Sequence, residues 1–94
     1  MDVLDRFKIA GKVAVITGGA GFLGIQHALA IAEAGGLPIL WDINEAAIEK
    51  TAKDVTQNTK NPCFGYKVDI TKPESIRKGL KLILKDYSKV DILI

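Results

Sequence analysis

A glycine-rich turn between an apolar run and a helical segment constrains this chain more than any other feature. Residues 13–17 read Val-Ala-Val-Ile-Thr, a short and almost wholly apolar run that is typical of a strand covered on both faces. A turn from Gly18 to Gly24 follows, and apolar residues then repeat at helical spacing until Gly35 and Gly36. The pattern predicts a buried strand, a tight turn and a helix that packs on the strand.

The same alternation continues along the chain. Apolar strand candidates recur at residues 37–41, 63–68 and 90–94. Asn44 is placed to cap the second helix, and Thr71-Lys-Pro-Glu74 is a capping-box pattern at the start of the third. The buried stripes of these two helices are predicted to be Ile48, Ala52 and Val55, and Ile76, Leu80, Ile83 and Tyr87.

Strands and helices that alternate over short connections indicate an α/β fold, in which helices cover both faces of a parallel sheet. Right-handed crossovers and the usual winding give the strand order 3-2-1-4. The predicted fold class is therefore a Rossmann-type doubly wound parallel sheet, β-α-β-α-β-α-β, in an incomplete form.

Composition excludes several other classes of protein. Hydrophobic residues make up 48% of the chain and charged residues 26%, which excludes disorder. Cys63 is the single cysteine, so a disulfide within the chain is excluded. No apolar run approaches the roughly 18 residues of a membrane span, and residues 1–6 do not resemble a secretion signal. We therefore expect a cytoplasmic location and no membrane partner.

Positive charge is concentrated in the second half of the chain. Residues 50–94 contain ten Lys and Arg against five Asp and Glu. A nucleic-acid interface would need a denser patch with arginine or aromatic residues between the lysines. We therefore expect no nucleic-acid partner and place the lysines on the solvated faces of helices, as at Lys53, Lys78, Lys81 and Lys85.

The glycine turn has the composition of a phosphate-binding turn. A pyrophosphate needs backbone N–H donors and the positive end of a helix close by. Gly18 suits the tight turn, Gly21 the close approach of the phosphates, and Gly24 the packing of helix on strand. The strand before the turn and the helix after it provide the context that this interpretation requires.

Asp42 is the second candidate, at the end of the second strand and 18 residues beyond Gly24. A carboxylate there can accept hydrogen bonds from both ribose hydroxyls of an adenosine, and it would repel a 2′-phosphate. No Arg or Lys stands at position 19, 20, 22 or 43 to offset that repulsion, so NAD is favoured over NADP. The alternative is a loop acid before the helix cap. Residues 1–94 are interpreted as the dinucleotide-binding portion of a single domain.

Four segments in order resemble the short-chain dehydrogenase/reductase family: residues 7–19, Asp42, residues 68–71 and residues 90–94. The resemblance implies NAD binding, with Asp69 near the adenine amino group and Ile70 lining the adenine pocket. It also implies that the backbone around Phe22 and Leu23 holds the pyrophosphate, and Ile43 is a further candidate beside Asp42. For Asp69 the alternative is a solvated acid at a strand end, and Trp41 either fills space beside Asp42 or flanks the adenosine pocket.

One departure from the family pattern keeps a second enzyme class open. The chain reads Thr-Gly-x-x-Gly-x-x-Gly, whereas the single-domain branch usually has Thr-Gly-x-x-x-Gly-x-Gly. The observed spacing is commoner in the branch of nucleotide-sugar epimerases and dehydratases. A third possibility, of another class, is a nucleotide-binding module without catalysis.

The catalytic motifs of the family are the larger departure. An Asn-Asn-Ala-Gly turn, a Ser and a Tyr-x-x-x-Lys pair would follow residue 94, together with the helices used for oligomerisation. Tyr66 and Tyr87 lack a lysine four residues later, His27 suits an exposed helix position and Cys63 a buried one, so no catalytic residue and no metal ligand is predicted. The resemblance implies a homo-oligomeric oxidoreductase that acts on an alcohol or ketone when complete, and a 94-residue chain that is inactive alone.

Overall fold

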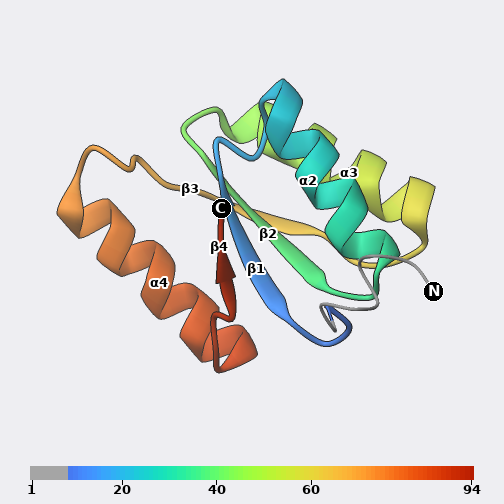
Figure 1. The fold of residues 1–94 in the computed structure, drawn as a ribbon. Helices are drawn as coiled ribbons and strands as arrows, with labels where there is room; N and C mark the ends of the chain where they lie inside the picture. Colours follow the sequence, from blue (N-terminus) through green and yellow to red (C-terminus); the bar gives the residue numbers. More distant parts are fainter. Residues whose placement is uncertain (1–8) are drawn as a thin grey trace.

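Four parallel strands form one sheet between two helical layers in the computed structural model, which describes residues 9–94 (Figure 1). The strands are β1 (Val13–Thr17), β2 (Leu37–Asp42), β3 (Phe64–Lys67) and β4 (Ile92–Leu93). The helices are α2 (Phe22–Glu33), α3 (Glu45–Thr59) and α4 (Pro73–Tyr87). The strand order is β3-β2-β1-β4, which confirms the predicted fold class and topology. Phe7 and Lys8, the start of the first family-like segment, lie outside the described residues.

Each face of the sheet has its own apolar core because the strands are buried on both sides. Helices α2 and α3 cover one face and α4 the other (Figure 1). Ala28, Ala32, Ile48 and Val55 pack on Ile16 and Leu40 on the α2–α3 face. The α4 face buries Val13, Val15, Ile39, Trp41, Val68 and Ile83. Alternate residues of β1 therefore enter different cores, as expected for a parallel strand between helices.

The predicted cap of α3 is confirmed, since the Ala47 N–H donates to Asn44 Oδ1 at 3.0 Å. The capping box at the start of α4 was wrong. Lys72 is the residue that precedes α4, no side chain caps this helix, and Thr71 Oγ1 instead donates to Asp69 Oδ1 at 2.6 Å. Thr71 thus lies one position before the N-terminal cap, where its hydroxyl oxygen does not accept from the first N–H groups of α4.

The predicted inward stripe of α4 also needs correction at Leu80, which is exposed. Gly79 is buried in its place, and a Cβ at Gly79 would lie 3.2 Å from Trp41 Cζ2. The indole ring of Trp41 occupies the space that a large helix side chain would need. Within residues 9–94, no helix has both the length and the apolar character that crossing a membrane would require.

Two predicted strands are shorter in the structure, because β3 covers only 64–67 and β4 only 92–93. Backbone pairing of β4 with β1 nevertheless extends beyond these limits. The Ile94 N–H donates to the Val15 carbonyl at 2.9 Å, and the Thr17 N–H donates to the Ile94 carbonyl at 2.9 Å. Leu93 and Ile94 are exposed, which is the outcome expected for an apolar strand at the edge of a sheet.

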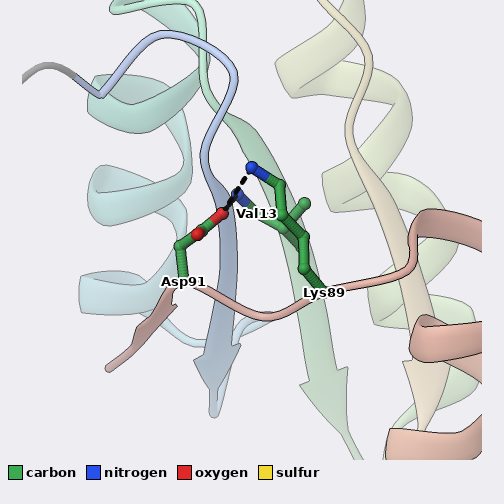
Figure 2. A network of polar contacts seen from close by, with 3 residues as sticks. All are labelled: Val13, Lys89 and Asp91. Atoms are coloured by element: carbon green, nitrogen blue, oxygen red, sulfur yellow. Dashed lines mark hydrogen bonds and ion pairs between the residues drawn. The ribbon is translucent and has the colours of Figure 1, made fainter.

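Asp91 connects the segment before β4 to the start of β1 through a hydrogen bond (Figure 2). Its Oδ2 atom accepts a hydrogen bond of 2.8 Å from the Val13 N–H and lies 3.0 Å from Lys89 Nζ. The bond from Val13, followed by that from Lys89, lowers the pKa of the Asp91 carboxyl below its ordinary value. The ionised form of Asp91 is therefore favoured in the folded state.

We expect this bond to make stability depend on acid pH. Because the folded pKa of Asp91 is lowered, its contribution is present above the ordinary carboxyl pKa of about 3.9 and is lost as the pH falls through the folded value. Asp91→Asn should therefore unfold at lower denaturant concentration at pH 7, with a difference from the wild type that shrinks towards pH 3. Asp54→Asn, an exposed change on α3 with the same loss of charge, should leave the profile unchanged. Equal profiles for the wild type and Asp91→Asn would contradict the expectation.

Candidate functional site

The carboxyl ends of β1, β2 and β3 meet at one edge of the sheet, and the predicted site residues lie there. The turn after β1 begins at Gly18, whose φ of +65° suits glycine, and its carbonyl accepts a 2.9 Å hydrogen bond from the Gly21 N–H. The Gly19 N–H donates to the Trp41 carbonyl at 3.1 Å, which holds the turn against the end of β2. The turn is therefore a fixed part of the sheet edge.

Two glycines are required by close packing within this turn. A Cβ at Gly24 would contact the Gly18 carbonyl oxygen and lie 2.7 Å from Gly19 Cα, so α2 approaches the turn more closely than any side chain permits. This is the packing role predicted for Gly24. Gly19 was missed, although a Cβ there would lie 2.8 Å from Leu40 Cβ. The adjacent pair of glycines after β1 was the signal that could have identified it.

The first turn of α2 leaves its backbone donors without a side-chain partner. Gly21 is the N-terminal cap in an extended conformation, and in the described part of the chain no side chain accepts from this end of α2. The first N–H groups of a helix have no partner inside the helix, so they can donate to an anion. Phe22 and Leu23 lie here with side chains that are 79% and 69% exposed. An exposed pair of apolar side chains beside free donors suits a bound molecule that covers them.

Asp42 joins the end of β2 to the glycine turn. Its Oδ2 accepts from the Ala20 N–H at 3.2 Å, and its Oδ1 accepts from the Asn44 N–H at 3.1 Å. The carboxylate therefore fulfils the loop role that the sequence left as an alternative, because it holds the start of the loop to Asn44. Each oxygen has a further lone pair, so the same carboxylate can still accept from two hydroxyl groups.

A hollow of about 230 Å³ lies beside Asp42. It brings together five of the predicted residues. Trp41 also lines it, although the residue is buried in the core of the α4 face, so the ring fills space beside Asp42 and borders the hollow as well. Ile43 and Ile70 expose 63% and 54% of their surface there, so both could cover an aromatic ring. Gly21, Phe22, Leu23 and Gly24 lie on the neighbouring turn and helix instead. The lining residues are Gly18, Trp41, Asp42, Ile43, Val68, Asp69, Ile70 and Thr71.

Asp69 contributes an ionised acceptor to the wall of this hollow. Its Oδ1 accepts from Thr71 Oγ1 at 2.6 Å and from the Thr71 N–H at 2.9 Å. The hydroxyl bond and then the backbone bond lower the pKa of the Asp69 carboxyl. Its own N–H donates to Ser75 Oγ at 2.9 Å. Asp69 is therefore held by its neighbours on both sides and keeps acceptor capacity for an amino group.

Three further residues with reactive side chains, Cys63, Tyr66 and His27, have surroundings that do not suggest a catalytic role. Cys63 is buried, and burial raises its pKa to about 12, so the thiol is not a nucleophile at neutral pH. The Tyr66 hydroxyl donates to Asp86 Oδ2 at 3.0 Å. Burial, and then this hydrogen bond, raise the pKa of Tyr66 above its ordinary value. His27 lies exposed on α2, as predicted.

A dinucleotide fits the groups at this edge. A glycine at position 18 with positive φ, uncapped N–H groups on α2 and a fixed carboxylate at the end of β2 match the phosphate and ribose needs of such a molecule. The hollow beside them, with exposed Ile43 and Ile70, matches the apolar faces of a base.

Comparisons with known proteins agree with this geometry. Residues 12–94 match the family model described as short chain dehydrogenase. A NAD-dependent glycerol dehydrogenase from Listeria innocua is 41% identical over 93% of this chain and 33% of its own length. The crystal structure of a NAD+-bound xylitol dehydrogenase is similar with a TM-score of 0.86 and 32% identity, over 92% of this chain and 33% of that one.

An L-sorbose reductase from Gluconobacter frateurii, solved in complex with NADPH and L-sorbose, gives a TM-score of 0.85 at 26% identity, over 90% of this chain and 32% of that one. The similar proteins thus include some described with NAD and one described with NADPH. The chain spans about a third of the length of the curated relatives it matches. Since the family model covers all but the first 11 residues, and the glycine turn, Asp42 and the sheet order agree with it, the chain belongs to the short-chain dehydrogenase family.

Proposed function

We propose that this chain is the NAD-binding portion of a single domain in an oxidoreductase, which transfers hydride between NAD and an alcohol or ketone. The observation that carries the proposal is the contact of Asp42 with the glycine turn, in which the carboxylate accepts from the Ala20 N–H beside an apolar hollow. This contact fixes the distance between the phosphate turn and the ribose acceptor. The bound dinucleotide would supply the hydride chemistry, and the residues of this chain bind and orient it.

Each part of the dinucleotide has a proposed partner. The pyrophosphate lies on the turn and on the backbone N–H groups at the start of α2. The adenosine ribose donates to Asp42, and the adenine ring lies between apolar side chains with its amino group near Asp69. The residues in these roles are Gly18, Gly21, Phe22, Leu23, Gly24, Asp42, Ile43, Asp69 and Ile70.

The preference for NAD over NADP rests on the charge of Asp42. Ala20 and Asn44 already donate to this carboxylate, which holds it at the end of β2 beside the glycine turn. An ionised carboxylate at the ribose would repel a 2′-phosphate. Positions 19, 20, 22 and 43 hold Gly, Ala, Phe and Ile, so none of them supplies a cation to offset the repulsion.

Asp42→Ala should weaken NAD binding by about tenfold or more, because bonds to a charged group contribute about 1.5–3 kcal/mol each. Isothermal titration calorimetry of the purified protein measures this loss. Asp54→Ala, which removes a carboxylate from the exposed face of α3, is the matched control and should keep the wild-type affinity. A folded wild-type protein that does not bind NAD, or that binds NADP more tightly, would contradict the proposal.

The remaining properties of the whole protein belong to the same proposal. The similar proteins named above are dehydrogenases or reductases of small alcohols and ketones, which supports an alcohol or ketone substrate. They also favour an oxidoreductase over the epimerase that the glycine spacing left open. A homo-oligomer follows from the family resemblance, and a cytoplasmic location from a composition with one buried cysteine.

A further inference from the structure

A second and larger hollow lies next to the one described, and none of its lysines has a role in the proposed NAD site. Its volume is about 530 Å³, and it shares Ile43 and Asp69 with the smaller hollow. It lies between the carboxyl end of β3 and the first turns of α4. The lining residues are Ile43, Lys67, Asp69, Lys72, Ser75, Lys78, Gly79 and Leu82.

Three of these residues are lysines, and they face a single carboxylate. Asp69 is the one acid in the lining, and its Oδ1 is already occupied by two bonds from Thr71. Within residues 9–94 the one ion pair joins Lys89 to Asp91, so Lys67, Lys72 and Lys78 have no carboxylate at ion-pair distance there. Three lysines and one carboxylate give the lining a net positive charge, which a bound anion would offset.

The neutral groups of the lining also suit a phosphate ester. Ser75 Oγ accepts from the Asp69 N–H, so its own hydroxyl hydrogen is left to donate to a ligand. Gly79 lies against Val68 and Trp41 and has no side chain to fill the hollow. Ile43 and Leu82 are exposed and provide apolar surface for the part of the ligand beyond the phosphate.

We propose that this hollow binds a phosphate group through Lys67, Lys72, Lys78 and Ser75, beside the NAD site. Lysine is a common phosphate ligand in proteins because its ammonium group is a compact charge with three donors. The phosphate has two possible sources. One is a separate phosphorylated compound, and the other is the additional phosphate of NADP, whose adenosine end would lie in the smaller hollow. Asp42 opposes the second source, so we expect the first.

The test compares two triple variants that lose the same charge. Lys67→Gln/Lys72→Gln/Lys78→Gln removes the three lysines of the hollow, and Lys53→Gln/Lys81→Gln/Lys85→Gln removes three exposed lysines that do not line it. Inorganic phosphate is titrated into each purified protein by calorimetry at low ionic strength, because pyrophosphate is the group proposed to bind the glycine turn. We expect saturable binding by the wild type, a loss of about tenfold or more in the first variant, and a small loss in the second. The proposal would be overturned if both variants lost phosphate affinity to a similar extent and the variant of the hollow kept its affinity for NADP.

NAD and NADP titrations of the same proteins identify the source. If the hollow variant loses binding of inorganic phosphate and keeps its NAD affinity, the phosphate comes from a separate compound. If it loses only affinity for NADP, the phosphate is that of the dinucleotide, and the hollow is still a phosphate site. If the folded hollow variant keeps its affinity for both phosphate and NADP, the proposed phosphate site is wrong. The NAD site is tested separately, because the Asp42→Ala variant should lose affinity for NAD and keep its affinity for inorganic phosphate.

Discussion

Gly24→Ala should lower the free energy of unfolding by about 2 kcal/mol, and NAD binding should be lost with it. The new Cβ would meet the Gly18 carbonyl oxygen and Gly19 Cα, which are backbone atoms of a turn bonded to β2. Overpacking costs about 1–3 kcal/mol or more where neighbours cannot move, whereas the gain in helix propensity from Gly to Ala is about 1 kcal/mol. The clash therefore outweighs the gain. Urea unfolding followed by circular dichroism measures the difference.

Gly21→Ala is the matched comparison for Gly24→Ala. Gly21 has a φ of −83°, and a Cβ there would lie 3.2 Å from the Gly18 carbonyl oxygen. Alanine is therefore nearly tolerated, and we expect a stability within about 1 kcal/mol of the wild type. If Gly21 lies against the pyrophosphate, the same variant should lose NAD affinity while it stays folded. A Gly24→Ala protein as stable as the wild type would show that the packing of α2 on the turn is looser than described.

Ile83→Ala should destabilise the protein by about 3 kcal/mol, the range expected for removing a large aliphatic side chain from a core. Ile83 is fully buried between α4 and the sheet, against residues that include Val15 and Trp41. Gly79 and Ile83 are the two buried residues of α4, so this helix depends on very few contacts for its position. Detachment of α4 would also disturb the hollow that contains Lys72 and Lys78.

Leu84→Ala provides the control on the same helix. It removes a side chain of the same size from the next position, where 45% of the residue is exposed. We expect a loss below about 1 kcal/mol, because nearly half of the residue is already exposed to solvent. Comparable losses from Ile83→Ala and Leu84→Ala would mean that the outer side of α4 is covered in the protein as it exists in solution.

The fold could be predicted because its signals are periodic. β1 and β2 read as continuous apolar runs since both faces are buried, and Asn44 caps α3 through a local bond that its neighbours do not contest. Strand order then follows from the handedness of crossovers and from the usual winding. These features depend on residues close together in the sequence or on general rules of topology.

The features that could not be predicted depend on contacts between distant segments. Gly79 faces Trp41, and Gly19 faces Leu40, so neither can be recognised from its neighbours in the chain. The capping-box pattern places Thr71 at the cap of α4, and only the fold shows that Lys72 is the cap and that Thr71 donates to Asp69. Lys78 is exposed, as predicted, but nothing in the sequence indicates that it lines one hollow together with Lys67 and Lys72.

The candidate site lies between these two cases. The spacing of Gly18, Gly24 and Asp42 places a turn and a carboxylate at neighbouring strand ends, and the structure brings them into contact through Ala20. The sequence could not show that Asp42 also binds the Asn44 N–H. A ribose acceptor and a loop anchor had seemed to be alternatives, yet one carboxylate has enough lone pairs for both.

The contact between Thr17 and Ile94 has a consequence for the order of assembly. Thr17 donates its hydroxyl to a carbonyl 77 residues further along the chain, immediately before the glycine turn. The N-terminal part of a protein emerges from the ribosome first. β1, α2 and β2 can therefore associate while one edge of β1 still has no partner. That edge closes only when the last residue described has emerged. The glycine turn is held to β2 through the Gly19 and Ala20 N–H groups, so it can form before β4 pairs with this edge of β1.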